Sequence, residues 1–234
     1  MVADGTRIGP YEVLGELGRG GMGVVLRARR HDLQRDFALK VILPGKDTTP
    51  EALERFRREA RAAARLAGHP GIVGVHDIGE ENGKVFFAMD LVEGASLDRL
   101  IDAGELSPRR VALIVSQAAR AVHHAHAHGV LHRDMKPGNI LVTETDDVRI
   151  TDFGLAQTQD SDGEAARLTK VGAVLGTPAY LSPEQANGDE LDARADVYSL
   201  GATLYEALTG DPPFVGDTVY KAKTGPADQA ARQR

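Results

Sequence analysis

The chain has 234 residues, of which 42% are hydrophobic and 26% are charged, and its formal net charge is −6. This composition is typical of a globular protein with one large domain or two small ones. The negative charge argues against nucleic acid as a partner, and the lack of cysteine excludes disulfides, thiolate catalysis and zinc sites built on cysteine.

The amino-terminal residues MVADGTRIGPYEV contain no charged segment followed by a long apolar run, so they do not resemble a signal peptide. No window reaches the roughly 18 uninterrupted apolar residues that a membrane span requires. We therefore expect a soluble, cytoplasmic chain without a membrane segment, in which residues 1–10 are a short extension.

Short apolar runs broken by glycines and charges predict three strands between Tyr11 and about Ile42, in YEVLGEL, VVLRAR and DFALKVIL. Residues 18–23 form the first hairpin connection. Two further strands are predicted in IVGVHDIGE and KVFFAMDLV, and the second ends at the turn signal Glu93-Gly94. These strands predict a small antiparallel sheet.

One helix interrupts the strands. In TPEALERFRREARAAARL the period becomes helical, with Thr49 or Pro50 at the start and Gly68 and Pro70 at the end. Leu53, Phe56, Ala60, Ala63 and Ala64 are expected to lie on one face of this helix.

After Gly94 the pattern is mainly helical. Helices are predicted in SLDRLIDAG, in SPRRVALIVSQAARAVHHAHAHG and in residues 191–210, and a strand pair is predicted in ILVTE and VRITDFG. The dense apolar residues of 191–210 suggest that this helix is buried. A sheet-rich half before a helix-rich half indicates an α+β fold with two lobes.

The boundary between the lobes should fall near residues 92–95, so that the lobes are residues 11–92 and 93–214. The polar residues 157–167 are expected to be a mobile loop, and residues 215–234 a polar tail.

Gly18, Gly20 and Gly23 form the pattern G-x-G-x-x-G, and Val25 follows two places on. Such a loop lets backbone amides lie close to phosphates, but a plain glycine hairpin or a dinucleotide-binding loop has the same pattern. A dinucleotide-binding loop opens a helix, whereas here the strand VVLRAR follows, which excludes that alternative.

Lys40 ends the strand FALK, and Glu59 lies in the middle of the following helix. Each can be interpreted in an ordinary way by itself, Lys40 as a surface charge and Glu59 as part of a solvated helix face that pairs with Arg55. Their joint position after a glycine loop favours a functional role, because a lysine that binds phosphate needs a carboxylate to hold it.

The stretch VLHRDMKPGNILV, residues 130–142, gathers charges and amides on one short turn between two apolar edges. Asp134 can accept a proton from a substrate hydroxyl, and Asn139 can bind a metal through its amide oxygen. Lys136 lies between them, where it offsets charge on a transferred phosphoryl group. Asp152 at a strand end is well placed to bind Mg²⁺, although a simple turn would account for Asp-Phe-Gly alone.

In this order, the elements resemble a Ser/Thr protein kinase of the bacterial, eukaryotic-like type. The resemblance extends from about Tyr11 to Phe214 and rests on GRGGMGVV, FALK, HRDMKPGN, DFG, GTPAYLSPE and DVYSLG. It implies a bilobal fold with a small antiparallel-sheet N-lobe and a helical C-lobe. It also implies ATP and Mg²⁺, or Mn²⁺, as cofactors and proteins with Ser or Thr hydroxyls as substrates.

The resemblance implies a role for each central residue. Lys40 would hold the α and β phosphates and pair with Glu59, while Asp134 would orient the attacking hydroxyl. Asn139 and Asp152 would bind the Mg²⁺ ions.

Further roles follow from the same resemblance. Lys136 is the family's mark of Ser/Thr specificity, and Thr177 would line the pocket for the substrate hydroxyl. Asp196 would brace the catalytic turn through backbone amides, and His132 would be a structural brace rather than a base.

Adenine would lie between the lobes, against the backbone of residues 90–92, with Met89 at the back of the pocket. The implied nucleotide-binding residues are Gly18, Gly20, Gly23, Val25, Ala38, Lys40, Met89, Asp90, Val92 and Leu141.

Arg133, directly before Asp134, suggests control by phosphorylation of the loop between Asp152 and Glu184, because a phosphate adds charge and acceptor oxygens. Thr169 is the preferred phosphosite, ahead of Ser161 and Thr158. Phosphorylation in trans would require a transient homodimer.

Four histidines crowd one predicted helix, at positions 123, 124, 126 and 128, and suggest a metal site. The pair His124 and His128 has no obvious third ligand in the sequence. A structural role in the helix that leads to the catalytic turn is therefore preferred.

The resemblance weakens after TGDPPF, where a kinase normally continues through several helices and a late arginine pairs with Glu184. We therefore expect a C-lobe that lacks its last helices, and a buried Glu184 would cost a few kcal/mol. Two functions stay open: a Ser/Thr kinase activated by autophosphorylation, or a truncated, weakly active or inactive kinase-like protein that binds nucleotide or a partner.

Overall fold

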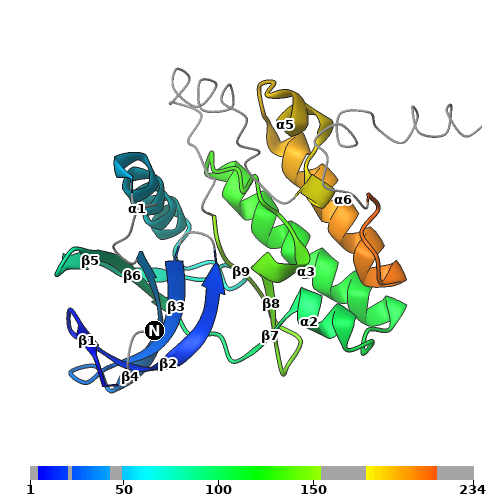
Figure 1. The fold of residues 1–234 in the computed structure, drawn as a ribbon. Helices are drawn as coiled ribbons and strands as arrows, with labels where there is room; N and C mark the ends of the chain where they lie inside the picture. Colours follow the sequence, from blue (N-terminus) through cyan, green and yellow to red (C-terminus); the bar gives the residue numbers. More distant parts are fainter. Residues whose placement is uncertain (1–4, 21–22, 43–48, 154–177, 215–234) are drawn as a thin grey trace, which may run out of the picture.

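A computed structural model of the chain describes residues 5–20, 23–42, 49–153 and 178–214. Its amino-terminal half is a sheet with one helix beside it, and its carboxy-terminal half consists mainly of helices (Figure 1). The α+β fold with a sheet-rich half before a helical half is confirmed. The predicted loop at 157–167 and the tail at 215–234 lie outside the described residues.

The amino-terminal sheet has six antiparallel strands in the order β1-β2-β3-β4-β6-β5. They are β1 (Arg7–Ile8), β2 (Tyr11–Gly20), β3 (Gly23–Arg30), β4 (Arg35–Ile42), β5 (Val75–Glu81) and β6 (Lys84–Asp90). Five of them were predicted. The edge strand β1 was not, and it places Ile8, which is buried, opposite Tyr11 within residues expected to be an extension.

The alternation of side chains along the strands gives the sheet two apolar faces. Phe86 and Ala88 of β6 lie on one face, where the ring of Tyr11 contacts Phe37 and Phe86 edge-on at centroid distances of 5.7 and 6.0 Å. The intervening residues of β6 face the other way, toward helix α1, and contribute Val85, Phe87 and Met89 to a second apolar cluster.

Helix α1 (Pro50–Arg65) begins as predicted, with the Thr49 side chain accepting a hydrogen bond from the Ala52 amide at 3.2 Å. The buried residues do not follow the predicted face throughout, because Ala64 is exposed and Ala62 is buried. The reason is that α1 contacts both halves of the molecule. Phe56 packs on the sheet, while Ala62 packs in the core of the helical half.

The helical half contains α2 (Leu97–Asp102), α3 (Pro108–Ala127), α5 (Pro183–Asn187) and α6 (Ala193–Thr209). Helices α3 and α6 lie side by side (Figure 1). A small antiparallel sheet, β7 (Gly94–Ser96), β8 (Ile140–Thr143) and β9 (Val148–Ile150), packs beside them. Within the described residues, no helix has the length and hydrophobicity needed to cross a membrane.

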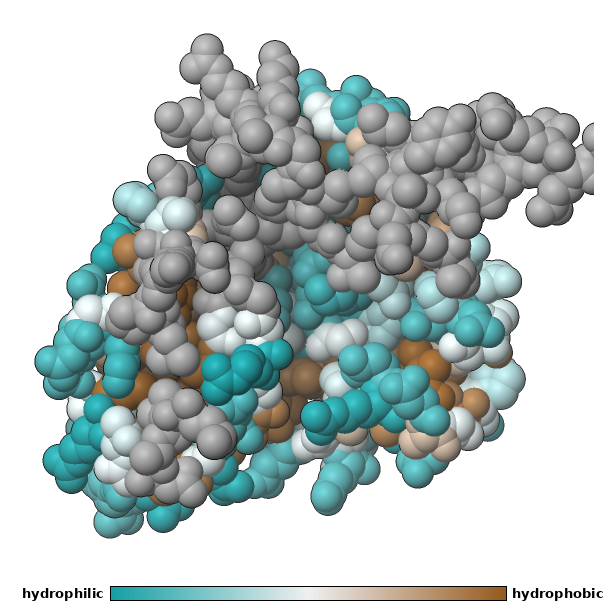
Figure 2. Space-filling view, viewed as in Figure 1, coloured by the Kyte–Doolittle hydropathy of each residue, from teal (hydrophilic) through white to brown (hydrophobic). Residues whose placement is uncertain are grey.

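Helix α6 is only partly buried, which corrects the expectation from its dense apolar residues. Its inner face includes the fully buried Asp196 and Thr203. On its outer face, Val197, Tyr205 and Leu208 are 63%, 50% and 50% exposed. Among the coloured residues on the face drawn in Figure 2, hydrophilic ones predominate, and hydrophobic ones show over the sheet and over part of the helical half.

Main-chain hydrogen bonds connect the segment after α1 to the end of β9. The amide of Ile150 donates to the carbonyl of Gly71 at 2.8 Å, and the amide of Val73 donates to the carbonyl of Ile150 at 2.9 Å. Asp152 follows two residues later, so this connection fixes it close to both halves of the molecule.

Candidate active site

The glycine loop lies in the β2–β3 hairpin, where Gly18 pairs with Val25 and Gly20 with Gly23. Gly23 has a φ of 154°, and a Cβ atom there would lie 2.1 Å from the carbonyl oxygen of Val41. Packing against β4 therefore requires this glycine. At Gly18 and Gly20 a Cβ atom would meet no described atom within 4 Å. Packing in the described part of the chain does not require these two glycines. Their lack of a side chain is better explained by the close approach of a ligand.

Lys40, from β4, lies between two carboxylates. Its Nζ donates to Glu59 Oε1 of α1 at 2.5 Å and to Asp152 Oδ1 at 2.8 Å. The side chains of Lys40 and Glu59 are only 15% and 4% exposed. The ordinary interpretations, a surface lysine and a solvated helix face, are therefore wrong for this pair. The structure brings together three residues that lie as much as 112 positions apart.

The charges in this cluster shift all three pKa values. Burial disfavours the charged ammonium of Lys40, but Asp152 and Glu59 outweigh that effect and raise its pKa. Burial and the charge of Asp152 raise the pKa of Glu59 to about 7, against the opposing effect of Lys40. Burial would also raise the pKa of Asp152, but Lys40 holds it below its ordinary value. The two carboxylates thus compete for one ammonium.

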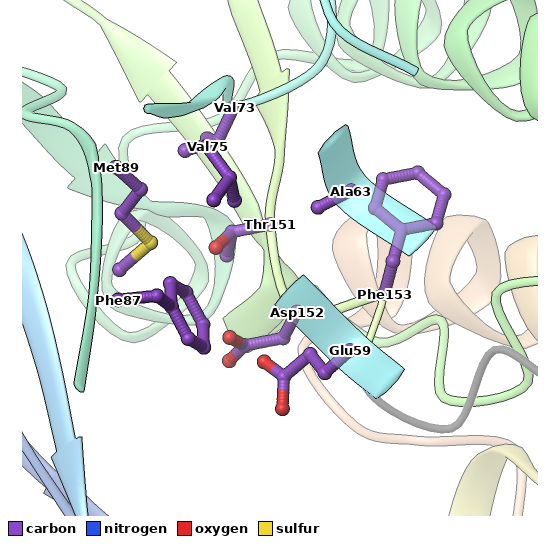
Figure 3. Close-up of a pocket in the computed structure, with 9 residues that line it drawn as sticks. All are labelled: Glu59, Ala63, Val73, Val75, Phe87, Met89, Thr151, Asp152 and Phe153. Carbon is purple, nitrogen blue, oxygen red and sulfur yellow. The ribbon is translucent and has the colours of Figure 1, made fainter. Parts of the chain in front are cut away.

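A small pocket lies behind the Lys40 cluster, and the sequence did not predict it. In Figure 3 the carboxylates of Glu59 and Asp152 lie next to each other at its edge. The lining residues are Glu59, Ala63, Val73, Val75, Phe87, Met89, Thr151, Asp152 and Phe153.

The catalytic turn predicted at residues 130–142 places Lys136 and Asn139 around Asp134. Lys136 Nζ donates to Asp134 Oδ2 at 2.7 Å, and Asn139 Nδ2 donates to the Asp134 carbonyl oxygen at 2.7 Å. Asn139 therefore holds the turn through its side-chain nitrogen. A metal ion would have to bind to the oxygen of the same amide. An amide oxygen and the carboxylate of Asp152 are hard oxygen donors that fit Mg²⁺.

His132 is fully buried beneath the turn. Its Nε2 lies 3.0 Å from the carbonyl oxygen of Thr151, to which it donates, and its Nδ1 accepts from the Asp134 amide at 3.3 Å. Its ring also packs on Phe153, with centroids 4.7 Å apart. Both ring nitrogens are thus used in holding the turn against the Asp152 segment, as expected of a brace.

Asp196 of α6 accepts three hydrogen bonds, two of which hold the turn from below. Its Oδ1 accepts from the Arg133 amide at 2.7 Å, and its Oδ2 accepts from the His132 amide at 2.8 Å and from His126 Nε2 at 2.7 Å. The amide contacts were predicted, but His126 was not, because it was one of four crowded histidines. Burial opposes ionisation of Asp196, yet His126 and the two amides lower its pKa.

Two residues of the site have left-handed backbone, Arg133 with a φ of 66° and Asp152 with a φ of 59°. Left-handed backbone is unfavourable for non-glycine residues and is common at functional sites. The Arg133 carbonyl accepts from Gln185 Nε2 of α5 at 2.7 Å, which adds a second support to the turn.

The residues expected around adenine lie in one apolar cluster. Ala38 and Met89 are buried in it, and Val25, Val92 and Leu141 pack against it. Because Leu141 lies on β8 and Ala38 lies on β4, the cluster spans both halves of the molecule.

Two of the crowded histidines, His124 and His128, form a ring stack with His69. The ring of His124 lies between those of His69 and His128, at centroid distances of 4.4 and 4.2 Å. His69 was not anticipated as a neighbour. Among the described residues, no group of three histidines or carboxylates could hold a metal ion.

The burial of Glu184 differs from the expectation drawn from the sequence. It is half-buried rather than buried, so the desolvation cost expected for it does not apply in full. Asp192 mainly, and Glu184 to a smaller extent, raise the pKa of Arg194. The predicted positions Thr158, Ser161, Thr169 and Thr177 lie outside the described residues.

Comparison with known proteins gives consistent matches. Residues 11–233 match the protein kinase domain family. The chain is 45% identical over 213 residues to the serine/threonine-protein kinase PknB of Mycolicibacterium smegmatis, and 47% identical over 216 residues to the DNA damage-responsive serine/threonine-protein kinase RqkA of Deinococcus radiodurans. These alignments cover 89% and 90% of this chain, but only 34% and 31% of the relatives. The chain therefore spans about a third of their length.

A solved structure agrees with the sequence matches. The kinase domain of PknI from Mycobacterium tuberculosis superposes with a TM-score of 0.74 and 32% identity, over 91% of this chain and 80% of that one. Because the family match covers nearly the whole chain and coincides with the arrangement around Lys40 and Asp134, the chain belongs to the protein kinase family.

Proposed function

We propose that the chain is a Ser/Thr protein kinase, which transfers the γ-phosphoryl group of ATP to Ser or Thr hydroxyls of proteins. The single observation that best supports this function is the contact of Lys40 with both Glu59 and Asp152, at 2.5 and 2.8 Å, beside the catalytic turn. The relatives named above as serine/threonine-protein kinases support the same activity.

In this proposal each half of the molecule contributes part of the nucleotide site, with the lobes at residues 11–92 and 93–214. The β2–β3 hairpin lies over the phosphates, and Lys40 binds the α and β phosphates while Glu59 holds it in place. The apolar cluster around Ala38 and Leu141 receives adenine, and the backbone of residues 90–92 binds its edge.

Asp134 carries the chemical step by accepting a hydrogen bond from the attacking hydroxyl and orienting it. Lys136, 2.7 Å from Asp134, offsets charge on the transferred phosphoryl group. Mg²⁺, or Mn²⁺, held by Asn139 and Asp152 would neutralise charge between the phosphates. His126, His132 and Asp196 act indirectly, because they hold the backbone that presents Asp134.

Regulation by phosphorylation of Thr169 in trans stays a prediction, as do the substrate-pocket role of Thr177, the transient homodimer and the cytoplasmic location. Thr169→Ala tests the first of these. Activity equal to that of the wild type would contradict it.

The proposed activity is tested with purified chain, Mg·ATP and a peptide library that contains Ser, Thr and Tyr acceptors. We expect phosphoserine and phosphothreonine, and no incorporation with Lys40→Met, because that variant lacks the ammonium that binds the phosphates. Failure of the wild type to bind nucleotide or to incorporate phosphate would contradict the proposal.

A further inference from the structure

Asp90, the last residue of β6, carries a carboxylate that three neighbours hold. Arg35 Nη2 of β4 and His76 Nε2 of β5 both lie 2.7 Å from its Oδ1, and the Gly74 amide donates to its Oδ2 at 3.0 Å. The Asp90 amide in turn donates to the Gly74 carbonyl at 2.9 Å. The main chain of Asp90 is therefore fixed to Gly74 just before β5, and its side chain is fixed to β4, to β5 and to Gly74.

The backbone around His76 is adapted to this contact. Val75 pairs with Met89 and Asp77 pairs with Ala88, so β5 contains one extra residue, His76, opposite β6. A bulge of this kind redirects a side chain and is common beside functional sites. Gly74 is adapted as well, because a Cβ atom there would lie 2.9 Å from Asp90 Oδ2.

The ring of Phe37 contacts the side chains of both Arg35 and His76. The Phe37 ring is buried, and the guanidinium of Arg35 lies 5.0 Å from its centroid. The ring of His76 contacts it edge-on at 5.4 Å. Burial opposes ionisation of Asp90, but the hydrogen bonds from His76 and Gly74 and the charge of Arg35 lower its pKa. The carboxylate is thus built into the sheet rather than loosely paired at the surface.

The neighbours of Asp90 in the chain indicate what its contacts with Arg35 and His76 are for. Met89 before it, and Leu91 and Val92 after it, belong to the apolar cluster proposed to receive adenine. The side chain of Asp90 faces Arg35 and His76 instead, because successive side chains of a strand point to opposite sides. Because the carboxylate belongs to the first residue of the segment 90–92, the contacts that hold it also restrict the backbone of this segment.

We propose that Arg35 and His76 are positioning residues of the nucleotide site, which fix the backbone that binds adenine by holding the carboxylate of Asp90. This inference rests on the proposed function. It adds two residues from β4 and β5 that do not touch the nucleotide and that none of the sequence motifs includes.

The test compares the dissociation constant of Mg·ADP, and kcat at saturating ATP, for the wild type and for His76→Ala. We expect the dissociation constant to rise about fivefold, which corresponds to about 1 kcal/mol for one lost hydrogen bond, with kcat within about twofold of the wild type. His76→Gln, which keeps an N–H donor, should recover most of the affinity. If His76 only stabilised the fold, His76→Ala would lower the melting temperature, and affinity and kcat would not change separately.

His31 provides the matched control, because it also pairs with a carboxylate at the surface of the same sheet, that of Glu12. His31→Ala should leave the affinity for Mg·ADP unchanged. Arg35→Ala should weaken binding like His76→Ala, and the double variant should lose less than the sum, since both residues bind the same oxygen.

Equal affinity of His76→Ala and the wild type would overturn the positioning role and leave the kinase proposal intact. The same loss in His31→Ala would also overturn it. If the wild type binds no Mg·ADP, both the proposed function and this inference are wrong.

Discussion

At the scale of single residues, Glu59 should give the protein a distinct pH dependence of stability. Its pKa is 4.5 in an unfolded chain and is raised to about 7 in the fold, chiefly by burial. The folded protein therefore keeps a proton that the unfolded chain releases. The stabilisation from this site is complete below pH 4.5, decreases as the pH rises and is lost above about 7.

Urea unfolding at pH 5 and pH 8 measures this effect. We expect Glu59→Gln to gain stability relative to the wild type as the pH rises, because glutamine cannot ionise. Glu80→Gln is the control, since the Glu80 side chain is 55% exposed. Equal pH dependence in the wild type and Glu59→Gln would contradict the raised pKa.

Substitutions of the glycines in the β2–β3 hairpin should differ in their effect, either on stability or on nucleotide binding. In Gly23→Ala the new methyl group would lie 2.1 Å from the Val41 carbonyl oxygen, in left-handed backbone. We expect a loss of about 3 kcal/mol in the free energy of unfolding. Gly18→Ala should change it by less than about 1 kcal/mol and weaken nucleotide binding instead. Similar urea midpoints for the two variants would contradict this division.

The sequence was most informative for residues that form a recognisable set along the chain, because most of them have an ordinary interpretation when taken singly. Lys40, Glu59, Asp134 and Asp152 could be singled out because their order along the chain is typical of a single kind of site. His126 and His76 could not, because a histidine by itself indicates nothing about its partner. Only the packing of α3 on α6, and the bulge in β5, bring these rings to the carboxylates they hold.

At the scale of elements, helix α6 supports the catalytic turn through one buried carboxylate. Asp196→Ala would leave the amides of His132 and Arg133 and the Nε2 of His126 without their acceptor. Breaking a buried charged network typically costs about 3–5 kcal/mol, so we expect a loss of that size in urea unfolding, together with loss of phosphoryl transfer.

Asp192→Ala on the same helix is the control for this prediction. Asp192 caps α6 by accepting from the Arg194 amide at 2.8 Å, and its side chain is 49% exposed. Loss of such a cap costs about 1 kcal/mol. Equal destabilisation by the two substitutions would argue against a special role for Asp196.

Long helices and strands with a clear period could be predicted from the sequence, whereas short ones could not. The strands between Tyr11 and Ile42 and the capped helices α1 and α3 were predicted, because long periodic segments with caps carry a strong local signal. The short elements β1, β7 and α5 were missed. Two to five residues carry no usable period, and their partners across the sheet or the adjacent helices decide their conformation.

At the scale of the whole molecule, the two halves meet where the chemistry is proposed. Hydrogen bonds between residues 71–73 and Ile150 join them, and Lys40 of one half contacts Asp152 of the other at 2.8 Å. The burial of Ala62 on α1 could not be predicted from the helix alone, because it depends on this junction. The proposed phosphoryl transfer therefore requires the two halves to act as one site for nucleotide and hydroxyl.

The most direct test of the proposed phosphoryl transfer is its rate from Mg·ATP in Asp134→Asn, measured beside the wild type with the binding of Mg·ADP to both. Asparagine keeps the size of the side chain but accepts a proton poorly. We expect transfer to fall by about 10²- to 10⁴-fold with nucleotide affinity within about twofold of the wild type. Transfer at the wild-type rate in Asp134→Asn would contradict the central claim.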